Sequence, residues 1–340
     1  MTPDGAKRLP LRDGAKRLPL SAVPSEDEVL SYFDTLSNWG RWGPGDELGT
    51  LNLVTPEKRM AAAQLVRVGT TVSCAWDIGG SPAAEQPFGP PQRLMIATGQ
   101  GLADAHRVQL PGRESDLGSG ALEHLGLVYH GYTVTHVDAL SHIFWDGRMY
   151  DDRPAELVTS PFGATQLAVT ALRDGVQTRG VLLDVAALRG VDWLEPGDGV
   201  SPDDLEGAEE RQALRVEEGD VVLLRTGYGR KVRDRGPDTV STGGRAGWQA
   251  ACLPWLRDRG VAMIACDTAQ DVMPSGYEKV RQPIHSVGIV AMGLWLIDNC
   301  DLETLARTCD AMGRSEFLFT LAPLRWVGAT GSPANPLATF

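Results

Sequence analysis

Short apolar runs bounded by glycine or aspartate recur through the middle of the chain. The segments GVLLDV (180–185), DVVLLRTG (220–227) and GVAMIACD (260–267) have the length and composition of buried strands. TTVSCAW (70–76) and YTVTHV (132–137) are rich in β-branched and aromatic residues, which also indicates strands. Helices are predicted between these strands, near residues 164–174, 247–259 and 302–309.

Two helices are predicted ahead of the first strand. Ser25 opens the sequence SEDE directly before VLSYF, and Ser25 with Glu28 makes a capping box, so structure is expected to begin there. Thr55 as N-cap and Pro56 as the first helical residue predict a second helix over 55–67. These two helices would form an N-terminal extension of the domain.

The mixture of strands and helices has no break in composition, which indicates one α/β domain with a mixed sheet over residues 21–340. DGAKRLPL occurs at 4–11 and again at 13–20. A repeat this short cannot bury a core, so residues 1–20 are expected to be a disordered tail. Segments rich in proline, glycine and aspartate at 79–91 and 229–244 are expected to be long loops.

The net negative charge of the chain argues against polyanionic partners. The chain has 340 residues and a net charge of −12, so nucleic acid and anionic membranes would be repelled. No apolar run approaches the ~18 residues of a membrane span. The five cysteines are far apart and none forms CxxC, so neither a zinc ribbon nor a disulfide scaffold is indicated. We therefore expect a cytoplasmic protein that acts on a small molecule.

The stretch HGYTVTHVDALSH (130–142) holds three of the chain's six histidines and an aspartate. On a strand, His136 and Asp138 would project from the same face about 6.6 Å apart, so they can converge on one ion or one reacting proton. A turn after Asp138 could bring His142 back toward the same pocket. Ionisable side chains this close together in an apolar segment favour a functional site.

This pattern, HxDxxxH followed by FWDGRMYDD, resembles the central motif of the cyclase family, which includes bacterial kynurenine formamidase and isatin hydrolase. Further stretches resemble family segments in the same order: RGVLLDVAALRGVDWLEPG (179–197), EEGDVVLLRTGYGR (217–230) and PIHSVGIVAMGLWLIDNCDLETLA (283–306). NWGRWGPGDELGTLNLVTPE (38–57) resembles the longer branch of the family. The resemblance thus extends from residue 38 to residue 310.

The resemblance implies a fold of the swivelling β/α/β-like type, a metal-assisted hydrolase of the arylformamidase kind, and a dimer or tetramer. By position, His136 and Asp138 match metal ligands, and His142 matches the residue that transfers protons. His285 matches a later ligand, and Asp298 stands where the family has a glutamate. These ligands would hold one Zn²⁺ or Mn²⁺, because both metals accept mixed nitrogen and oxygen ligands.

Two positions depart from the family pattern HxGTHxDxxxH. Tyr132 stands at its first ligand position and Val134 at its glycine. A phenol with a pKa of about 10 is a poor ligand at neutral pH, so Tyr132 is expected to pack or to donate a hydrogen bond to substrate. Extended chain would place His130 about 20 Å from His136, so His130 is not expected to supply the missing ligand unless the chain folds back at Gly131. At most one ion is expected.

Other residues are candidates for holding the substrate. The loop WGRWG carries Trp39, Arg41 and Trp42 and could form the wall of a pocket for an aromatic substrate, although tryptophans are more often core residues. Trp76 is a further candidate of this kind. Weaker candidates follow predicted strands, where open α/β folds place their sites: Arg225, Thr226, Asp267 and Gln270.

Three functions remain open from the sequence. The first is a metal-assisted hydrolase that opens an amide or lactone of a small cyclic or aromatic substrate, with His142 as general acid and base. The second is a metal-independent cyclase, dehydratase or isomerase of secondary metabolism, in which His136 and Asp138 form an acid–base pair and His142 or Tyr132 is the second proton donor. The third is a binding protein that has kept the pocket and lost the chemistry.

Overall fold

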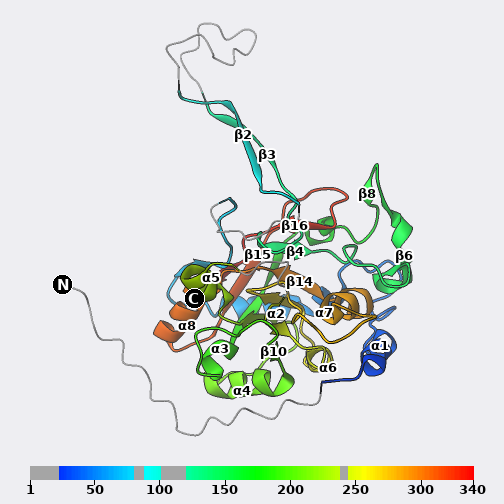
Figure 1. Ribbon diagram of the computed structural model, residues 1–340, viewed down its shortest axis with the longest axis vertical. Helices are drawn as coiled ribbons and strands as arrows, with labels where there is room; N and C mark the ends of the chain where they lie inside the picture. Colours follow the sequence, from blue (N-terminus) through cyan, green and yellow to red (C-terminus); the bar gives the residue numbers. More distant parts are fainter. Residues whose placement is uncertain (1–22, 80–87, 101–119, 238–243) are drawn as a thin grey trace, which may run out of the picture.

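A computed structural model describes residues 23–79, 88–100, 120–237 and 244–340. A nine-stranded sheet runs through the centre of the molecule (Figure 1). Its strands lie in the order β1 (Thr71–Ser73), β17 (Leu337–Thr339), β15 (Glu316–Leu321), β9 (Val176–Asp184), β11 (Val221–Arg225), β13 (Met263–Cys266), β14 (Trp295–Asp298), β4 (His136–Asp138) and β16 (Gly331–Pro333).

The centre of this sheet is parallel and its two flanks are antiparallel. β9, β11, β13 and β14 pair in parallel, whereas β15 pairs antiparallel with β9 on one side and β4 antiparallel with β14 on the other. The parallel strands are buried, which explains why they are the continuous apolar runs of the sequence. The chain is therefore a mixed-sheet α/β domain, as the sequence predicted.

Among the described residues, four two-stranded sheets surround the main sheet. They are β2 (Gln92–Ala97) with β3 (Leu122–Gly126), β5 (Arg148–Met149) with β6 (Arg153–Pro154), β7 (Val158–Thr159) with β8 (Gly163–Ala164), and β10 (Gly199–Val200) with β12 (Gly247–Trp248). The first of these pairs extends from the body as an arm (Figure 1).

The α-helices are α1 (Glu26–Thr35), α2 (Pro56–Ala63), α3 (Val185–Leu188), α4 (Pro202–Gln212), α5 (Tyr228–Arg235), α6 (Cys252–Asp258), α7 (Pro283–His285) and α8 (Glu303–Met312). The 3₁₀ turns are η1 (Gly49–Leu53), η2 (Tyr150–Asp152), η3 (Ala155–Leu157) and η4 (Val169–Leu172), and the π-helix η6 (Ser286–Met292) continues α7. Within the described residues, no helix has the length and apolar character needed to cross a membrane.

The two N-terminal helices begin where the sequence predicted. Ser25 accepts a hydrogen bond from the backbone N–H of Glu28 and caps α1, and Thr55 caps α2 in the same way, with Pro56 in the first turn. α2 ends at Ala63, earlier than expected. The helices therefore follow from capping chemistry that local sequence carries.

Three sequence predictions were wrong in part. The helix expected over 164–174 is the single 3₁₀ turn η4, and the loop expected over 229–244 begins as helix α5. The strand expected over 132–137 is only β4, because the chain before His136 is bent. The predicted tail at residues 1–20 lies outside the described residues, as does most of the loop predicted at 79–91.

Candidate metal centre

β4 brings its two ionisable side chains to the middle of the molecule. His136 and Asp138 are both buried, and they alternate with Val137 so that they share one face of the sheet. β4 lies between β14 and β16, and its register places Asp298, the last residue of β14, opposite His136. Sequence-distant carboxylates therefore meet at the carboxyl end of a buried strand.

Two further histidines lie against Asp138. The ring of His142 stacks on that of His130 with centroids 3.7 Å apart and planes nearly parallel. Nδ1 of His130 lies 3.0 Å from Oδ1 of Asp138, and Nε2 of His142 lies 3.9 Å from Oδ2. The turn after β4 that returns His142 is closed by its backbone N–H donating to the carbonyl of Ala139.

The position of His130 corrects the sequence analysis. An extended chain was expected to hold His130 far from His136, but their ring centroids are 5.2 Å apart. Gly131 has φ 142°, a conformation that L side chains rarely adopt, and it lets the chain fold back. The side-chain amide of Asn299 donates to the carbonyls of Gly131 and Val134 and holds this bend. The glycine after His130 was the signal in the sequence.

His285 approaches the same carboxylates from another part of the chain. Its Nε2 lies 3.3 Å from Oδ2 of Asp298 and 3.6 Å from Oδ2 of Asp138. Its Nδ1 lies 2.5 Å from Oδ2 of Asp271, and Oδ1 of the same carboxylate accepts the backbone N–H of Ile284 at 2.7 Å. Asp271 thus orients His285, and nothing in the sequence distinguished it as a member of the site.

The hydrogen bonds of the outer nitrogens fix which ring nitrogen carries the proton. Nδ1 of His136 lies 2.8 Å from the carbonyl of Val134, which can only accept, so this nitrogen is protonated. In the neutral ring its Nε2 then presents a lone pair to Oδ1 of Asp138, 3.4 Å away. In His285, Nδ1–H donates to the carboxylate of Asp271, so Nε2 of its neutral ring also presents a lone pair to the carboxylates of the cluster. Lone pairs that face carboxylates repel each other unless a positive charge lies between them.

The carboxylate oxygens themselves lack partners. Both oxygens of Asp138 and Oδ1 of Asp298 are buried without a hydrogen bond from any described residue, and the close approach of His130 to Asp138 is not aligned for one. Unpartnered buried carboxylate oxygens are strongly destabilising unless a cation compensates them. Two ligands of one tetrahedral ion are about 3.4 Å apart when each is about 2.1 Å from the metal. The measured separations of 3.3, 3.4 and 3.6 Å fit that requirement.

The donor set offers two overlapping groups. His136, Asp138 and Asp298 form one, and His130, Asp138 and His142 form the other; within each group the candidate ligand atoms lie within 4.8 Å of one another. Asp138 belongs to both. The sequence analysis expected at most one metal ion, because Tyr132 occupies the first ligand position of the family pattern. In the structure His130 places a histidine beside Asp138, where that first ligand was expected to be missing.

The pKa shifts show that positive charge is favoured at the centre of the cluster. Burial opposes the charged form of His136, but the Asp138 carboxylate outweighs it and raises the pKa of His136. Burial likewise opposes charge on His285, but Asp298 and Asp271 raise its pKa well above the ordinary value. Burial would raise the pKa of Asp138, yet the neighbouring histidines, His142 first, hold it well below the ordinary value.

His142 behaves differently from the other histidines. Burial lowers its pKa to about 4, because the attraction of Asp138 does not offset the loss of solvent and the like charges of neighbouring histidines. Its side chain retains 24% of its exposure, whereas that of His136 retains 2%. His142 is therefore neutral at pH 7 and, like His130 at 21%, is a cluster histidine that solvent reaches, so it can accept a proton from a molecule in solvent.

Most of the predicted substrate-binding residues lie outside this cluster. The indole N–H of Trp39 donates to the carbonyl of Val290, five residues beyond His285, and Arg41 lies over the ring of Trp42. Trp42 packs against the hydrophobic core. Tyr132 packs under the guanidinium of Arg245, 4.0 Å from its ring centroid. The loop WGRWG is thus held against the far end of η6.

Two of those residues lie close to the ligands. The backbone N–H of Trp76 donates to the hydroxyl of Thr135, which precedes His136. Gln270 is fully buried beside Asp271, and its amide N–H donates to the carbonyl of Ile297, next to Asp298. Gln270 also leaves its amide oxygen without a partner among the described residues, so it remains a candidate for contact with a ligand.

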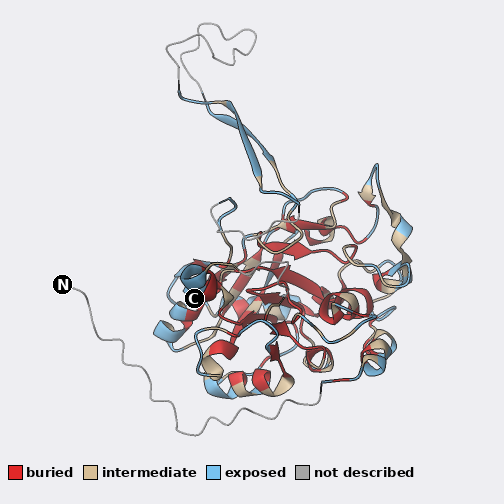
Figure 2. Ribbon diagram, viewed as in Figure 1, coloured by how far each residue is buried: buried red, intermediate tan, exposed pale blue. Residues whose placement is uncertain are grey.

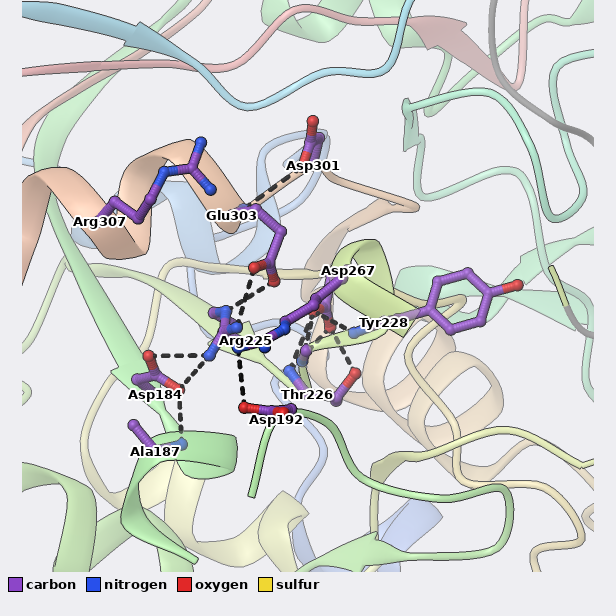
Figure 3. Close-up of polar contacts among 12 residues, drawn as sticks. Asp184, Ala187, Asp192, Arg225, Thr226, Tyr228, Asp267, Asp301, Glu303 and Arg307 are labelled. Carbon is purple, nitrogen blue, oxygen red and sulfur yellow. Dashed lines mark hydrogen bonds and ion pairs between the residues drawn. The ribbon is translucent and has the colours of Figure 1, made fainter. Parts of the chain in front are cut away.

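A second polar network lies at the carboxyl ends of β9 and β11 (Figure 3). The guanidinium of Arg225 donates to both oxygens of Glu303 and both of Asp184 at 2.8–3.1 Å. The carboxylate of Asp267 accepts the backbone N–H groups of Thr226 and the two residues that follow it. These groups have their partners in place, which is typical of a structural network.

Beside this network is a cavity of about 570 Å³. Arg225, Asp184 and Glu303 form part of its wall, and none of the clustered histidines contributes to it. The cavity is therefore distinct from the carboxylate–histidine cluster. The buried carboxylate oxygens that have no hydrogen-bond partner among the described residues, and that indicate a functional site, belong to the cluster.

Comparison with known proteins gives the following similarities. The Cyclase family model matches residues 71–270, more than half of the chain. No curated protein matches it. A solved structure of a novel cyclase superposes with a TM-score of 0.79 and 31% identity, covering 90% of this chain and 100% of that chain.

Two isatin hydrolases share the fold at lower identity. Isatin hydrolase A from Ralstonia solanacearum has a TM-score of 0.54 and 20% identity, covering 84% of this chain and 97% of its own. An isatin hydrolase bound to the product analogue thioisatinate has a TM-score of 0.55 and 15% identity, covering 84% and 98%. At these identities the similarity concerns the fold.

Proposed function

The chain belongs to the cyclase family, and from that premise we propose that it is a metal-dependent hydrolase that opens an amide or lactone bond of a small cyclic or aromatic substrate. One observation carries the proposal. The two buried oxygens of Asp138 have no hydrogen-bond partner among the described residues and lie near Nε2 of His136 and of His285, whose Nδ1–H groups donate hydrogen bonds elsewhere. Oδ1 of Asp298 likewise has no partner in the described part of the chain. Such a set of donors is suited to a divalent cation.

The fold holds the side chains that would bind the metal ion in position. His136, Asp138, His285 and Asp298 would hold Zn²⁺ or Mn²⁺, and His130 would add a nitrogen near Asp138. A bound ion would polarise the scissile carbonyl and lower the pKa of water toward ~7. The Asp271 carboxylate, by fixing Nδ1 of His285, orients Nε2 toward the site.

His142 moves the proton. Its Nε2 accepts the proton that water loses as the water oxygen bonds to the carbonyl carbon. The same nitrogen returns that proton to the leaving nitrogen as the C–N bond breaks, which yields a carboxyl group and an amine. Stacking on His130 holds the His142 ring in position for both transfers.

Two features support the proposed substrate class. The family relation supports hydrolysis, and two isatin hydrolases share the fold, so isatin-like cyclic amides and formylanilides are the compounds to test first. Gln270 and Trp76, which lie beside ligand-bearing segments, would contact the substrate.

The test is activity as a function of metal. Protein stripped with chelator should lose turnover of isatin-like lactams or formylanilides, and addition of Zn²⁺ or Mn²⁺ should restore it. Asp138→Asn should not be restored, whereas Asp258→Asn on α6, a matched loss of charge away from the cluster, should behave as wild type. Full activity of the stripped protein would refute the proposal.

A metal-independent cyclase, dehydratase or isomerase is the alternative that one observation favours. The raised pKa values of His136 and His285 mean that protons can neutralise the cluster in place of an ion. In that case the purified protein would contain no stoichiometric metal and would be active without it. Elemental analysis of protein purified without chelators distinguishes the two.

A further inference from the structure

The cavity at the carboxyl ends of β9 and β11 has no part in the proposed hydrolysis, because none of the clustered histidines lines it. Open α/β folds commonly bind ligands at this edge of their sheet. Helices α5 and α8 contribute to its wall, and both combine buried and exposed residues, as helices at the surface do (Figure 2). The volume of about 570 Å³ is within the range of small-molecule sites.

The inner wall of the cavity is a closed network of charges. Arg225 is buried and lies between the carboxylates of Asp184 and Glu303, to which its guanidinium donates (Figure 3). These three groups bind one another through charge-assisted hydrogen bonds. They therefore shape the cavity and are not free to bind an occupant.

The arginines of α5 also have acidic partners. Nη1 of Arg230 lies 2.8 Å from Oδ1 of Asp192, and Arg233 pairs with Asp301. The guanidinium of Arg233 lies over the ring of Trp76, 4.6 Å from its centroid. A ligand would have to displace an existing ion pair in order to bind either arginine.

Helix α8, in contrast, presents one charge of each sign without an ion-pair partner among the described residues. These are Arg307 and Asp310, which both line the cavity and are both exposed. The guanidinium of Arg307 donates to the hydroxyl of Thr304 at 2.9 Å, and Figure 3 shows no contact from it to the other residues drawn. Both charges are thus available to a molecule in the cavity.

The surroundings of Asp310 favour a positive charge beside it. Burial and then the negative charge of Asp184 raise the pKa of Asp310, and the more distant Arg211 and Arg225 only partly oppose this rise. An ammonium group placed between Asp310 and Asp184 would relieve the repulsion between the two carboxylates.

The charge of the whole wall limits the class of ligand. Four arginines and five acidic residues line the cavity, which gives a formal charge of −1. A phosphate or another polyanion would be repelled by that charge. In the described part of the chain, the groups of side chains able to hold a metal ion lie in the central cluster and not here. A purely apolar ligand would leave charged groups desolvated and unpaired.

We propose that this cavity binds a small zwitterion, an α-amino acid, with its carboxylate on the guanidinium of Arg307 and its ammonium beside Asp310. Side chains three residues apart on a helix have Cβ atoms about 5–6 Å apart, which suits the short separation of the two charges in an α-amino acid. A guanidinium can donate two parallel hydrogen bonds to one carboxylate. Small side chains at Ala187, Val191 and Ala306 leave room for the rest of the molecule.

The first test is isothermal titration calorimetry with three related compounds. L-Glutamine is the first probe, because its amide can hydrogen-bond to the charged wall without adding charge. Glutaramic acid lacks its ammonium group, and 4-aminobutanamide lacks its carboxylate. Glutamine should bind with a Kd in the millimolar range or tighter, and each analogue should bind about 10-fold more weakly, because each loses a charge-assisted hydrogen bond.

Two variants assign the ends of the ligand. Arg307→Gln should remove the preference for glutamine over 4-aminobutanamide, and Asp310→Asn should remove the preference over glutaramic acid. A purely structural effect of either substitution would weaken all three compounds alike and would contradict the assignment. Arg173→Gln and Asp174→Asn, matched losses of charge at exposed residues outside the cavity wall, should bind as wild type.

The same titrations with metal-stripped protein separate this site from the proposed metal centre. Glutamine should bind equally well with and without metal, because the cavity shares no residue with the cluster. Binding that disappears with the metal would place the ligand at the centre and overturn the proposal. Equal affinity for glutamine and glutaramic acid, or no binding of any common α-amino acid at millimolar concentration, would overturn it as well.

Discussion

The side chains that define the centre are oriented by partners outside it. The carbonyl of Val134 accepts a hydrogen bond from Nδ1–H of His136, and the carboxylate of Asp271 accepts one from Nδ1–H of His285. Nε2 of each histidine therefore faces inward. Both oxygens of Asp138 and Oδ1 of Asp298 then have no hydrogen-bond donor within the part of the chain that the structure describes. The arrangement is complete only with a positive charge at its middle, which is the physical basis of the proposed metal dependence.

Replacement of His142 separates chemistry from metal binding. Because His142 is neutral and partly exposed, His142→Ala should lower kcat on a turned-over lactam or formylanilide by about 10²–10⁴-fold while metal content is retained. His124→Ala on the arm removes a histidine away from the cluster and is the matched control. Wild-type kcat in His142→Ala would contradict the assignment of the proton transfer.

Asp271 acts on the centre through His285. Asp271→Asn removes the charge that orients Nδ1 but leaves the inward ligands intact, so metal affinity should fall by about 10–100-fold. Competition with a chromophoric chelator measures this change. An affinity equal to wild type would mean that His285 is held by its backbone alone.

The bend at Gly131 can be tested without touching a ligand. A side chain at position 131 has free space around it, but φ 142° is strained for any L residue. Gly131→Ala should therefore cost about 1 kcal/mol or more of stability and shift His130 from Asp138, lowering activity. Gly69→Ala, also at positive φ in open space, should cost similar stability with activity unchanged. Equal activity of the two variants would contradict the role given to the bend.

Residue-level chemistry was only partly predictable from the sequence. His136, Asp138 and His142 share one short motif, and the structure brings them together with His285 and Asp298. His130 was misplaced because a straight strand was assumed where a glycine bends the chain. Asp271 gave no signal, since its role depends on a helix that begins twelve residues later.

At the scale of elements, the strands that carry the centre follow from hydrophobic pattern. β11 and β13 are buried throughout and lie within the segments predicted for them. β9 begins at Val176, four residues before the predicted segment 180–185, because its first half is only partly buried and includes polar residues. The short turn η4 was predicted as a helix because its apolar residues fit that period, yet Leu167 before it has φ 58° and breaks the helical path. The pattern of apolar residues along the sequence does not show where the backbone must adopt a positive φ, as it does at Leu167.

Helix α4 offers a test of stability against pH. Asp204, at the third helical position, accepts hydrogen bonds from the backbone N–H of Ser201 and from the guanidinium of Arg189 at 2.6 and 2.9 Å. Burial would raise its pKa, but these donors outweigh burial and lower it below the ordinary value. The contribution of Asp204 is therefore fully present above pH ~4 and is lost as pH falls through the lower pKa of the folded state.

Asp204→Asn should reduce the free energy of unfolding by about 2–3 kcal/mol at pH 7. Denaturant titrations of both proteins should give a constant difference from pH 7 to pH 5 and a shrinking difference below pH ~4. Asp203→Asn, one residue earlier in the same first turn, is the control and should show a smaller effect. A difference that persists unchanged at the lowest pH would contradict the ionic role of Asp204.

At the scale of the whole molecule, the sheet brings three segments that are remote in the sequence to one place, one of them being β4 with the bend that precedes it. The carboxyl end of β14, the start of β4, the bend at residues 130–134 and the first turn of α7 converge on Asp138, while the arm leads directly into the bend. Fold class could be anticipated from the alternation of elements, and family membership from motifs spread over the chain. The projection of the arm could not, because nothing local distinguishes an exposed hairpin from a covered one.

The most direct test of the metal centre is an anomalous difference map from a crystal of active protein loaded with Zn²⁺ and measured at the zinc edge. The expected peak lies about 2.0–2.2 Å from carboxylate oxygens of Asp138 and Asp298 and from Nε2 of His136 or His285. A map of active, zinc-treated protein with no peak among these residues, or with their side chains turned apart, would contradict the account.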